Sequence, residues 1–180
     1  MVTFDPPVSV TPLSVVDPGS IVRWKEAATW RVGFTVISNG DPNRRAIAAY
    51  YPGAHHFGWH HREGDLTVLS YGRDIIVRPD VESFAPDLTV TAGDVTLYTL
   101  EGAPTLIVMA GNDHSDMRFL NVETGNIESR RSWPLMSGYR TWSAGVCLRD
   151  GTFVEVLSVS PRSGSDQQST DSSDLEPLDP

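Results

Sequence analysis

The stretch Trp30-Arg31-Val32-Gly33-Phe34-Thr35-Val36-Ile37 carries the most regular hydrophobic pattern in the chain. Every second side chain from Trp30 to Val36 is large and apolar, and Arg31, Gly33 and Thr35 stand between them. Because successive side chains of a β-strand point to opposite faces of a sheet, this alternation predicts a strand with one face in a hydrophobic core. We therefore take residues 30–37 as a core strand.

The same two-residue pattern recurs on both sides of this strand, and helical periodicity is nearly absent. Gly, Pro, Asn and Asp, the residues that form turns, separate the strand-like runs at short intervals. We expect strands at residues 21–24, 44–51, 66–71, 75–77, 88–90, 95–100, 105–110, 117–122, 127–133, 139–148 and 152–159. About a dozen short antiparallel strands predict an all-β domain, either a β-sandwich or a barrel-like sheet.

Turn sequences predict how several of these strands pair. Asn39–Asn43 is dense in turn formers and should return the chain antiparallel to the core strand. Gly72–Asp74 predicts a tight hairpin between the two runs that flank it, and residues 79–86 are expected to form a loop. The three runs between residues 88 and 110 are expected to form a meander. Two further hairpins are expected at Glu123–Asn126 and Arg149–Gly151.

At 180 residues, the chain is long enough for one hydrophobic core and too short for two ordinary domains plus a tail. Residues 20–160 are predicted to form a single β-sandwich-like domain. Residues 1–19 alternate weakly around Pro12 and are predicted to be an N-terminal arm or edge strand, because proline cannot donate a hydrogen bond within a sheet. Residues 161–180 are rich in Ser, Asp and Pro, and predict a polar tail with almost nothing to bury.

The formal net charge of −9 argues against nucleic-acid binding, which depends on clustered Lys and Arg. No aliphatic run approaches the roughly 20 residues that span a bilayer, and the first residues show no signal-peptide pattern. We therefore expect a soluble protein made in the cytoplasm, with neither nucleic acid nor membrane as a partner. The single cysteine, Cys147, excludes an internal disulfide and is expected to be a buried, inert thiol within an apolar pattern.

Residues 50–63 concentrate the side chains with the most distinctive chemistry, including four of the five histidines. Imidazole and carboxylate groups are common ligands of zinc, iron and manganese. The candidate metal ligands are His60, His61, Glu63 and His114. In an extended chain, however, His61 and Glu63 share a face while His60 points away. The alternative is an exposed loop of histidines, or a loop packed on a neighbouring subunit, with no bound cofactor.

The sequence His60-His61-Arg62-Glu63 resembles part of the first motif of the cupin family, which places His-x-His and a Glu ahead of a strand and Gly. This chain lacks the alternating pair of histidines. The second cupin histidine would correspond to His114, whose surroundings at residues 112–116 differ from the family motif. The resemblance implies a metal-dependent enzyme.

Residues 30–69 resemble the central β-sandwich of the hyaluronate, chondroitin and xanthan lyases. The matching residues are Trp30, Arg45, Tyr50, Gly58-Trp59-His60, Glu63-Gly64 and Thr67-Val68-Leu69. Gly53-Ala54-His55 stands where the lyases have Gly-Glu-Asn. Because those lyases carry their chemistry largely on a helical domain for which this chain has no room, the resemblance implies a sandwich and not an enzyme.

Three functions follow from these observations. The first is a non-catalytic structural or interaction subunit of a larger assembly of virion type, such as a phage capsid decoration or tail protein. It is favoured by the all-β pattern and by the lack of a nucleophile elbow, phosphate loop or dinucleotide motif. Assembly contacts with other protein subunits are then expected at residues 2–16 and 163–180. The expected interaction residues are Tyr50, Tyr51, His55, His56, Trp59 and His60.

The second function is a carbohydrate-binding sandwich, because apolar sugar faces pack on aromatic rings. Its stacking platform would consist of Trp59, Tyr50, Tyr51 and His60. The third function is the cupin-like metal enzyme, with the ligands named above.

Overall fold

The computed structural model describes residues 8–38, 41–60, 66–89, 95–109, 117–129 and 136–161. Within these residues the fold is all-β, with a sheet of twelve strands, a sheet of three strands and no α-helix. Two short 3-10 helices complete it: η1 (Leu13–Val15) and η2 (Val81–Ser83). The predicted all-β fold is confirmed as a sandwich-like domain, and it is not a closed barrel.

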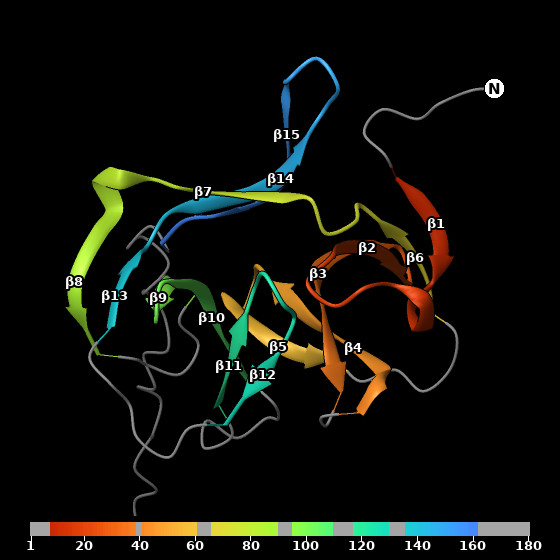
Figure 1. Ribbon diagram of the computed structural model, residues 1–180, viewed down its shortest axis with the longest axis horizontal. Coiled ribbons are helices and arrows are strands. Elements are labelled where there is room, and N and C mark those ends of the chain that lie inside the picture. Colours follow the sequence, from red (N-terminus) through yellow and green to blue (C-terminus); the bar gives the residue numbers. More distant parts are fainter. Residues whose placement is uncertain are drawn as a thin grey trace, which may run out of the picture.

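The large sheet of twelve strands runs in the order β1-β6-β2-β3-β4-β5-β10-β9-β13-β8, with β11 and β12 attached to β10 (Figure 1). Its strands are β1 (Ser9–Pro12), β2 (Ile21–Glu26), β3 (Thr29–Ser38), β4 (Asp41–Tyr51), β5 (His56–His60), β6 (Thr67–Ser70), β8 (Phe84–Leu88), β9 (Leu97–Leu100), β10 (Ala103–Met109), β11 (Met117–Asn121), β12 (Ile127–Glu128) and β13 (Met136–Tyr139).

The small sheet has the order β15-β14-β7. Its strands are β7 (Ile75–Pro79), β14 (Trp142–Cys147) and β15 (Phe153–Val159). Figure 1 shows β7 and β14 crossing over the large sheet, while the turn end of the β14–β15 hairpin projects away from the body.

The core strand expected from its alternation is confirmed as β3. Phe34 and Val36 are fully buried on one face, as predicted. Thr35 on the opposite face is also buried, and its hydroxyl donates a hydrogen bond to the carbonyl oxygen of Asp17. The middle of β3 is therefore covered on both faces, and Trp30 near its start is half exposed.

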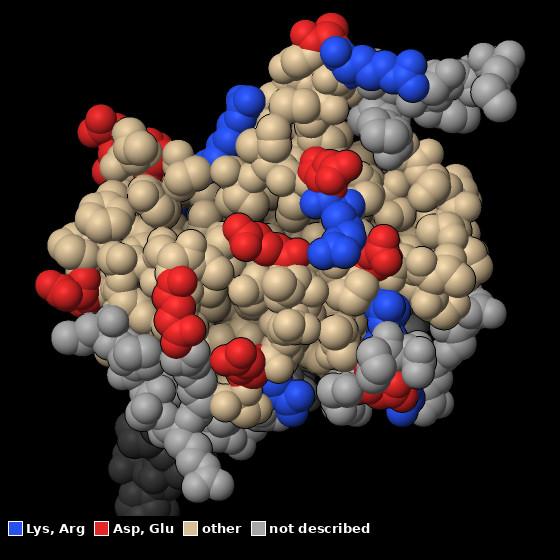
Figure 2. Space-filling model, viewed as in Figure 1, with Lys and Arg blue, Asp and Glu red and all other residues tan. Residues whose placement is uncertain are grey.

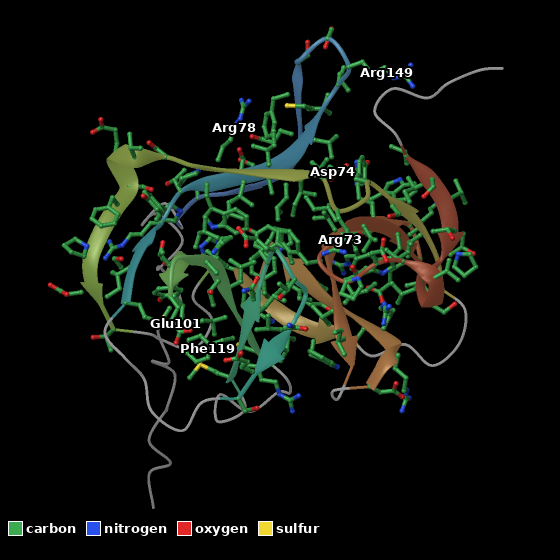
Figure 3. All side chains as sticks on the ribbon, in the orientation of Figure 1. Arg73, Asp74, Arg78, Glu101, Phe119 and Arg149 are labelled. Atoms are coloured by element: carbon green, nitrogen blue, oxygen red, sulfur yellow. The ribbon has the colours of Figure 1, made fainter. Side chains whose placement is uncertain are left out.

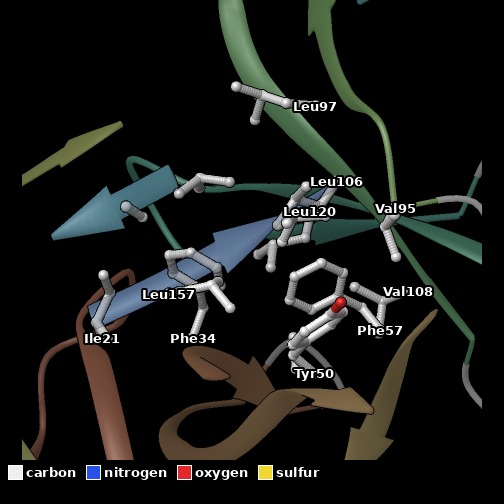
Figure 4. Packing of buried hydrophobic residues seen from close by; sticks show 14 of the residues in the cluster. Ile21, Phe34, Tyr50, Phe57, Val95, Leu97, Leu106, Val108, Leu120 and Leu157 are labelled. Carbon is white, nitrogen blue, oxygen red and sulfur yellow. The ribbon is translucent and has the colours of Figure 1, made fainter. Parts of the chain in front are cut away.

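The main core lies between the two sheets. Trp142 of the small sheet stacks on Phe57 of the large sheet, with ring centroids 6.0 Å apart. Its indole Nε1 donates a hydrogen bond to the carbonyl oxygen of Val95 at 2.8 Å. Burying one large side chain stabilises a fold by about 2–3 kcal/mol, so this residue is a strong tie between the sheets. Its neighbours in the same core include Phe34, Tyr50, Leu106, Leu120 and Leu157 (Figure 4).

A second, smaller core lies under the N-terminal segment. Leu13 and Val16 pack there against residues of β2, β4 and β6, namely Val22, Trp24, Ile47, Ala49 and Val68. Two hydrogen bonds of 2.8 Å hold the segment: Leu13 N–H donates to the Leu66 carbonyl, and Arg45 Nε donates to the Val16 carbonyl. Residues 9–16 thus belong to the domain, and β1 is the edge strand expected around Pro12.

The prediction of a hairpin at Gly72–Asp74 is wrong. β6 pairs with β1 and β2 in the large sheet, whereas β7 pairs with β14 in the small sheet. Gly72 adopts a φ of +78°, and Ile75 N–H donates to the Arg73 carbonyl at 2.7 Å, which turns the chain from one sheet to the other. A short glycine turn serves a hairpin and a crossover equally well, so the local sequence did not separate the two.

The expected meander forms only in part. β9 and β10 make a hairpin whose turn residues Glu101 and Gly102 both have positive φ, as a type I′ turn requires. β8 begins at Phe84, inside the expected loop, and pairs with β13, which lies between β8 and β9. Pairing with a strand some fifty residues later overrides the local order.

The hairpins expected at Glu123–Asn126 and Arg149–Gly151 are confirmed as β11–β12 and β14–β15. β4 begins at Asp41 instead of the expected Arg44, so the Asn39–Asn43 turn is shorter than predicted. One pairing departs from the antiparallel expectation: β5 and β10 run parallel, with Phe57 opposite Val108.

Candidate functional site

The histidine-rich segment is not the loop expected from the sequence. His56–His60 form β5, which pairs with β4 on one side and with β10 on the other. Phe57 is fully buried, and Gly58 lies opposite Ala49. Phe57 and Trp59 supply a short two-residue alternation within the histidines, which was the signal for a strand. A central strand therefore replaces the exposed loop.

The sheet divides the expected interaction residues between its two faces. Tyr50 and Trp59 pack on the side of the main core, whereas Tyr51 packs against the second core. This follows from the strand geometry, since neighbouring residues of β4 point to opposite faces. The structure thus does not bring Tyr50, Tyr51 and Trp59 together as one stacking platform.

Tyr50 is a core residue. It is 8% exposed, and its ring lies 5.2 Å from that of Phe57 between centroids. Burial disfavours the ionised phenol and raises the pKa of Tyr50 above its ordinary value. A side chain in this position stabilises the sandwich and has little surface to offer a ligand.

Tyr51 and His56 form a small stack on the outer side of the large sheet. Their ring centroids are 5.4 Å apart, and the Arg31 guanidinium lies 5.5 Å from the Tyr51 ring. Arg31 also forms an ion pair with Glu26 at 3.3 Å. A Cβ on Gly58 would approach the Tyr51 ring to 3.0 Å, so the glycine lets the ring lie close to the strand.

Trp59 packs on the opposite face of the sheet from this stack, and His55 directly precedes β5. The Arg118 guanidinium is placed 5.6 Å from the Trp59 ring, an arrangement typical of a cation–π contact. His55 adopts a left-handed φ of +55° in the turn before β5, where its N–H donates to the Tyr51 carbonyl at 2.7 Å. It lines a cavity of about 620 Å³ together with Asp87 and Arg140.

Most of the candidate metal site lies outside the described residues. His61, Glu63 and His114 belong to that part of the chain, and of His60 the structure describes the backbone alone. In the residues that are described, no group of three His, Cys, Asp or Glu side chains is placed to hold a metal ion.

Cys147 is exposed, contrary to the expected buried thiol. Trp142, Ala144 and Val146 are the residues of β14 that turn inward, which puts Cys147 on the outer face opposite Phe153. The apolar run was correctly taken as a strand, but the side that Cys147 occupies depends on this register.

The open edge of β1 is the most distinctive exposed surface. Among the described residues β1 pairs with β6 alone, and Val10 and Val15 beside it are 71% and 69% exposed. Residues 8–16 contain no charged side chain. Figure 2 shows the same feature, with no acidic or basic atoms over β1 on the visible face, whereas the tip of the β14–β15 hairpin carries both.

Main-chain geometry leaves hydrogen-bonding groups of β1 open. Leu13 N–H donates to Leu66, and the register pairs Thr11 with Val68, so the odd-numbered residues bond to β6. In an antiparallel pair the alternate residues point the other way. The N–H and C=O of Val10 therefore face outward from the sheet.

Comparison with protein families, with curated proteins and with solved structures finds no match to this chain. Among the described residues, no helix is long and apolar enough to cross a membrane.

Proposed function

We propose that this protein is a non-catalytic structural subunit of a larger protein assembly and that it joins a neighbouring subunit through the edge of β1. The observation that carries the proposal is an uncharged, open strand edge with two exposed valines. Native proteins ordinarily protect such edges, because unpaired N–H and C=O groups invite pairing with another chain.

The other edge strands support this assignment by contrast. Among the described residues, each of them contains a charged residue: Asp87 in β8, Glu128 in β12, Arg78 in β7 and Glu155 in β15. β8 and β7 also contain proline, and both β8 and β15 take part in a register shift. Charge, proline and bulges are the usual means of preventing edge-to-edge association.

The anchoring of β1 suits a contact surface. Because Leu13 and Val16 are buried and tied by hydrogen bonds, the strand is held in place before any partner arrives. A preformed edge avoids the entropic cost of ordering a free arm on binding. A virion-type shell or tail is the setting we propose, because such an assembly consists of many subunits joined by repeated contacts of one kind.

The carbohydrate-binding alternative has less support. Tyr50 is buried in the core, and Tyr51 and Trp59 pack on opposite faces of the sheet. The remaining aromatic side chain on each face is accompanied by an arginine, Arg31 or Arg118.

Light scattering coupled to size-exclusion chromatography tests the proposal. We expect the full chain to associate with increasing concentration, and Val10→Lys to weaken this association by about tenfold or more, because a lysine on an edge strand opposes pairing. The matched control is Ser158→Lys, which places the same charge on an exposed position of β15. A full chain that stays monomeric at every concentration, or a Val10→Lys variant that associates like the parent, would contradict the proposal.

A further inference from the structure

The two sheets leave a cavity of about 360 Å³ between β7 and the β9–β10 hairpin. Ile75 and Val77 form its wall on the small sheet; they pack against the main core, yet both stay half-buried. Leu97 and Pro104 form the wall on the large sheet. A cavity of this size lies within the range of small-molecule sites, about 300–1,000 Å³.

Two opposite charges, Arg73 and Glu123, line the same cavity. Both side chains are exposed. Among the described residues, no ion pair joins Arg73 to Glu123. Figure 3 shows Arg73 beneath the start of β7, on the side of the large sheet, whereas Arg78 points away from it.

Each of these charges stands on a fixed turn. The Arg73 carbonyl accepts a hydrogen bond from Ile75 N–H at 2.7 Å, directly after Gly72 with its positive φ. The Asn121 side-chain oxygen accepts from the N–H groups of Glu123 and Thr124 at 3.0 and 3.1 Å. The two backbones are therefore held in place, which limits the entropy lost when a ligand binds.

We propose that this cavity binds a small zwitterion with an apolar side chain, of the class of the hydrophobic α-amino acids. The carboxylate pairs with Arg73, the ammonium pairs with Glu123, and the side chain fills the space between Val77 and Leu97. A simple anion is attracted by Arg73 and repelled by Glu123, and the reverse holds for a simple cation, so a ligand with both charges complements the two residues best.

Isothermal titration calorimetry of the full chain with four matched ligands tests the charge requirement. Leucine and phenylalanine carry both charges, N-acetyl-leucine lacks the ammonium, and leucinamide lacks the carboxylate. We expect leucine or phenylalanine to bind, and each of the two leucine analogues to bind about tenfold more weakly or worse, the usual effect of losing a charged hydrogen bond.

Neutralising each of the two protein charges in turn tests which group of the ligand that residue binds. Arg73→Gln should weaken leucine binding about tenfold and should not weaken leucinamide binding, because that analogue has no carboxylate to lose and is no longer repelled by the guanidinium. Glu123→Gln should weaken leucine binding similarly and should not weaken N-acetyl-leucine binding, which loses a like charge in the same way. Arg149→Gln and Glu155→Gln remove the same charges from exposed positions of the β14–β15 hairpin and should change nothing.

Filling the cavity with a larger side chain provides an independent test. Val77→Phe should abolish leucine binding, and if that variant does not fold, the substitutions of exposed Arg73 and Glu123 still decide the question. The proposal is overturned if neither amino acid binds at millimolar concentration. It is equally overturned if one of the singly charged analogues binds as tightly as leucine, or if both charge substitutions leave leucine binding unaltered.

Discussion

The edges of β1 and β15 show two ways of ending a β-sheet. β1 closes the large sheet with four residues that carry no charge, and its central residue Val10 is largely exposed. β15 closes the small sheet with seven residues, among them exposed Glu155, and a register shift opposite Ala144 and Gly145 disturbs its pairing. The first edge is suited to receive another strand, and the second is protected against one.

The difference extends to how each edge is held. β1 depends on side chains that follow it, since Leu13 and Val16 are buried in the second core. β15 is held by its own side chains Leu157 and Val159, which are buried in the main core, and by a local turn in which Leu148 N–H donates to the Thr152 carbonyl at 2.8 Å. The open edge is therefore anchored by residues that follow the strand, and the protected edge by residues within it.

Removing the anchor of β1 should have the largest effect. Leu13→Ala deletes a buried side chain and should lower the free energy of unfolding by about 3 kcal/mol, as measured by denaturant titration. Hydrogen exchange of the β1 amides should accelerate in the same variant. The control Val15→Ala lies in the same short helix but is exposed, and should change stability by less than about 0.5 kcal/mol. Equal effects of the two substitutions would show that the second core does not hold β1.

The second-largest effect on stability should come from a substitution that pushes apart the backbones of the β14–β15 hairpin. A Cβ at position 145 would collide with the Val154 carbonyl oxygen and approach the Phe153 ring to 2.9 Å. Gly145→Ala should therefore cost about 2 kcal/mol of unfolding free energy, the usual range for overpacking.

The matched control for this substitution is Gly53→Ala. A Cβ at Gly53 meets no atom within 4 Å, and this glycine is not among those with positive φ. Its replacement should leave stability unchanged or raise it by about 0.5 kcal/mol, because alanine restricts the unfolded chain. If Gly145→Ala is as harmless as Gly53→Ala, the hairpin tolerates a wider separation than its backbone contacts imply.

The features that the sequence predicted well are those decided by neighbouring residues. Phe34 and Val36 alternate within one strand, and Arg149–Gly151 closes a hairpin between adjacent strands. Both follow from local periodicity and turn chemistry. The edge position of β1 followed in the same way from Pro12.

The features that it missed depend on long-range pairing. β5 was obscured because polar histidines surround Phe57 and Trp59, and β10, its second partner, lies about fifty residues away. Gly72 directs the chain to another sheet, a choice made by the partner strands and not by the turn. The cavity beside Arg73 draws its lining from several separate segments, so no single motif announces it.

Removing the charge from β15 should make the two edges more alike. Glu155→Val leaves β15 without a charged residue, and we expect a weak gain in self-association, about two- to threefold in apparent affinity, because one protective charge is gone. The effect should be small, since the register shift remains. Analytical ultracentrifugation measures it, with Glu82→Val in exposed η2 as the control. A control that associates equally would assign the gain to general hydrophobicity.

The smallest expected effect is the pH dependence of the turn at the tip of the β14–β15 hairpin. The backbone N–H of Thr152 donates to the Asp150 carboxylate at 2.8 Å, and this bond, followed by one from the Thr152 hydroxyl, lowers the pKa of Asp150 below its ordinary value of 3.8. A lowered folded pKa means that the carboxylate stabilises the turn above pH 3.8 and loses this contribution as the pH falls through the folded value.

Carboxyl NMR of Asp150 should therefore show a titration midpoint below 3.8. Thr152→Ala keeps the backbone donor and removes the hydroxyl, so its midpoint should rise only part of the way back. A midpoint at or above 3.8 in the parent protein would show that the turn does not close on Asp150 in solution. Residues 8–16, which include β1, contain no ionisable side chain. Lowering the pH through the folded pKa of Asp150 should therefore loosen the tip of the protected edge and leave the open edge unchanged.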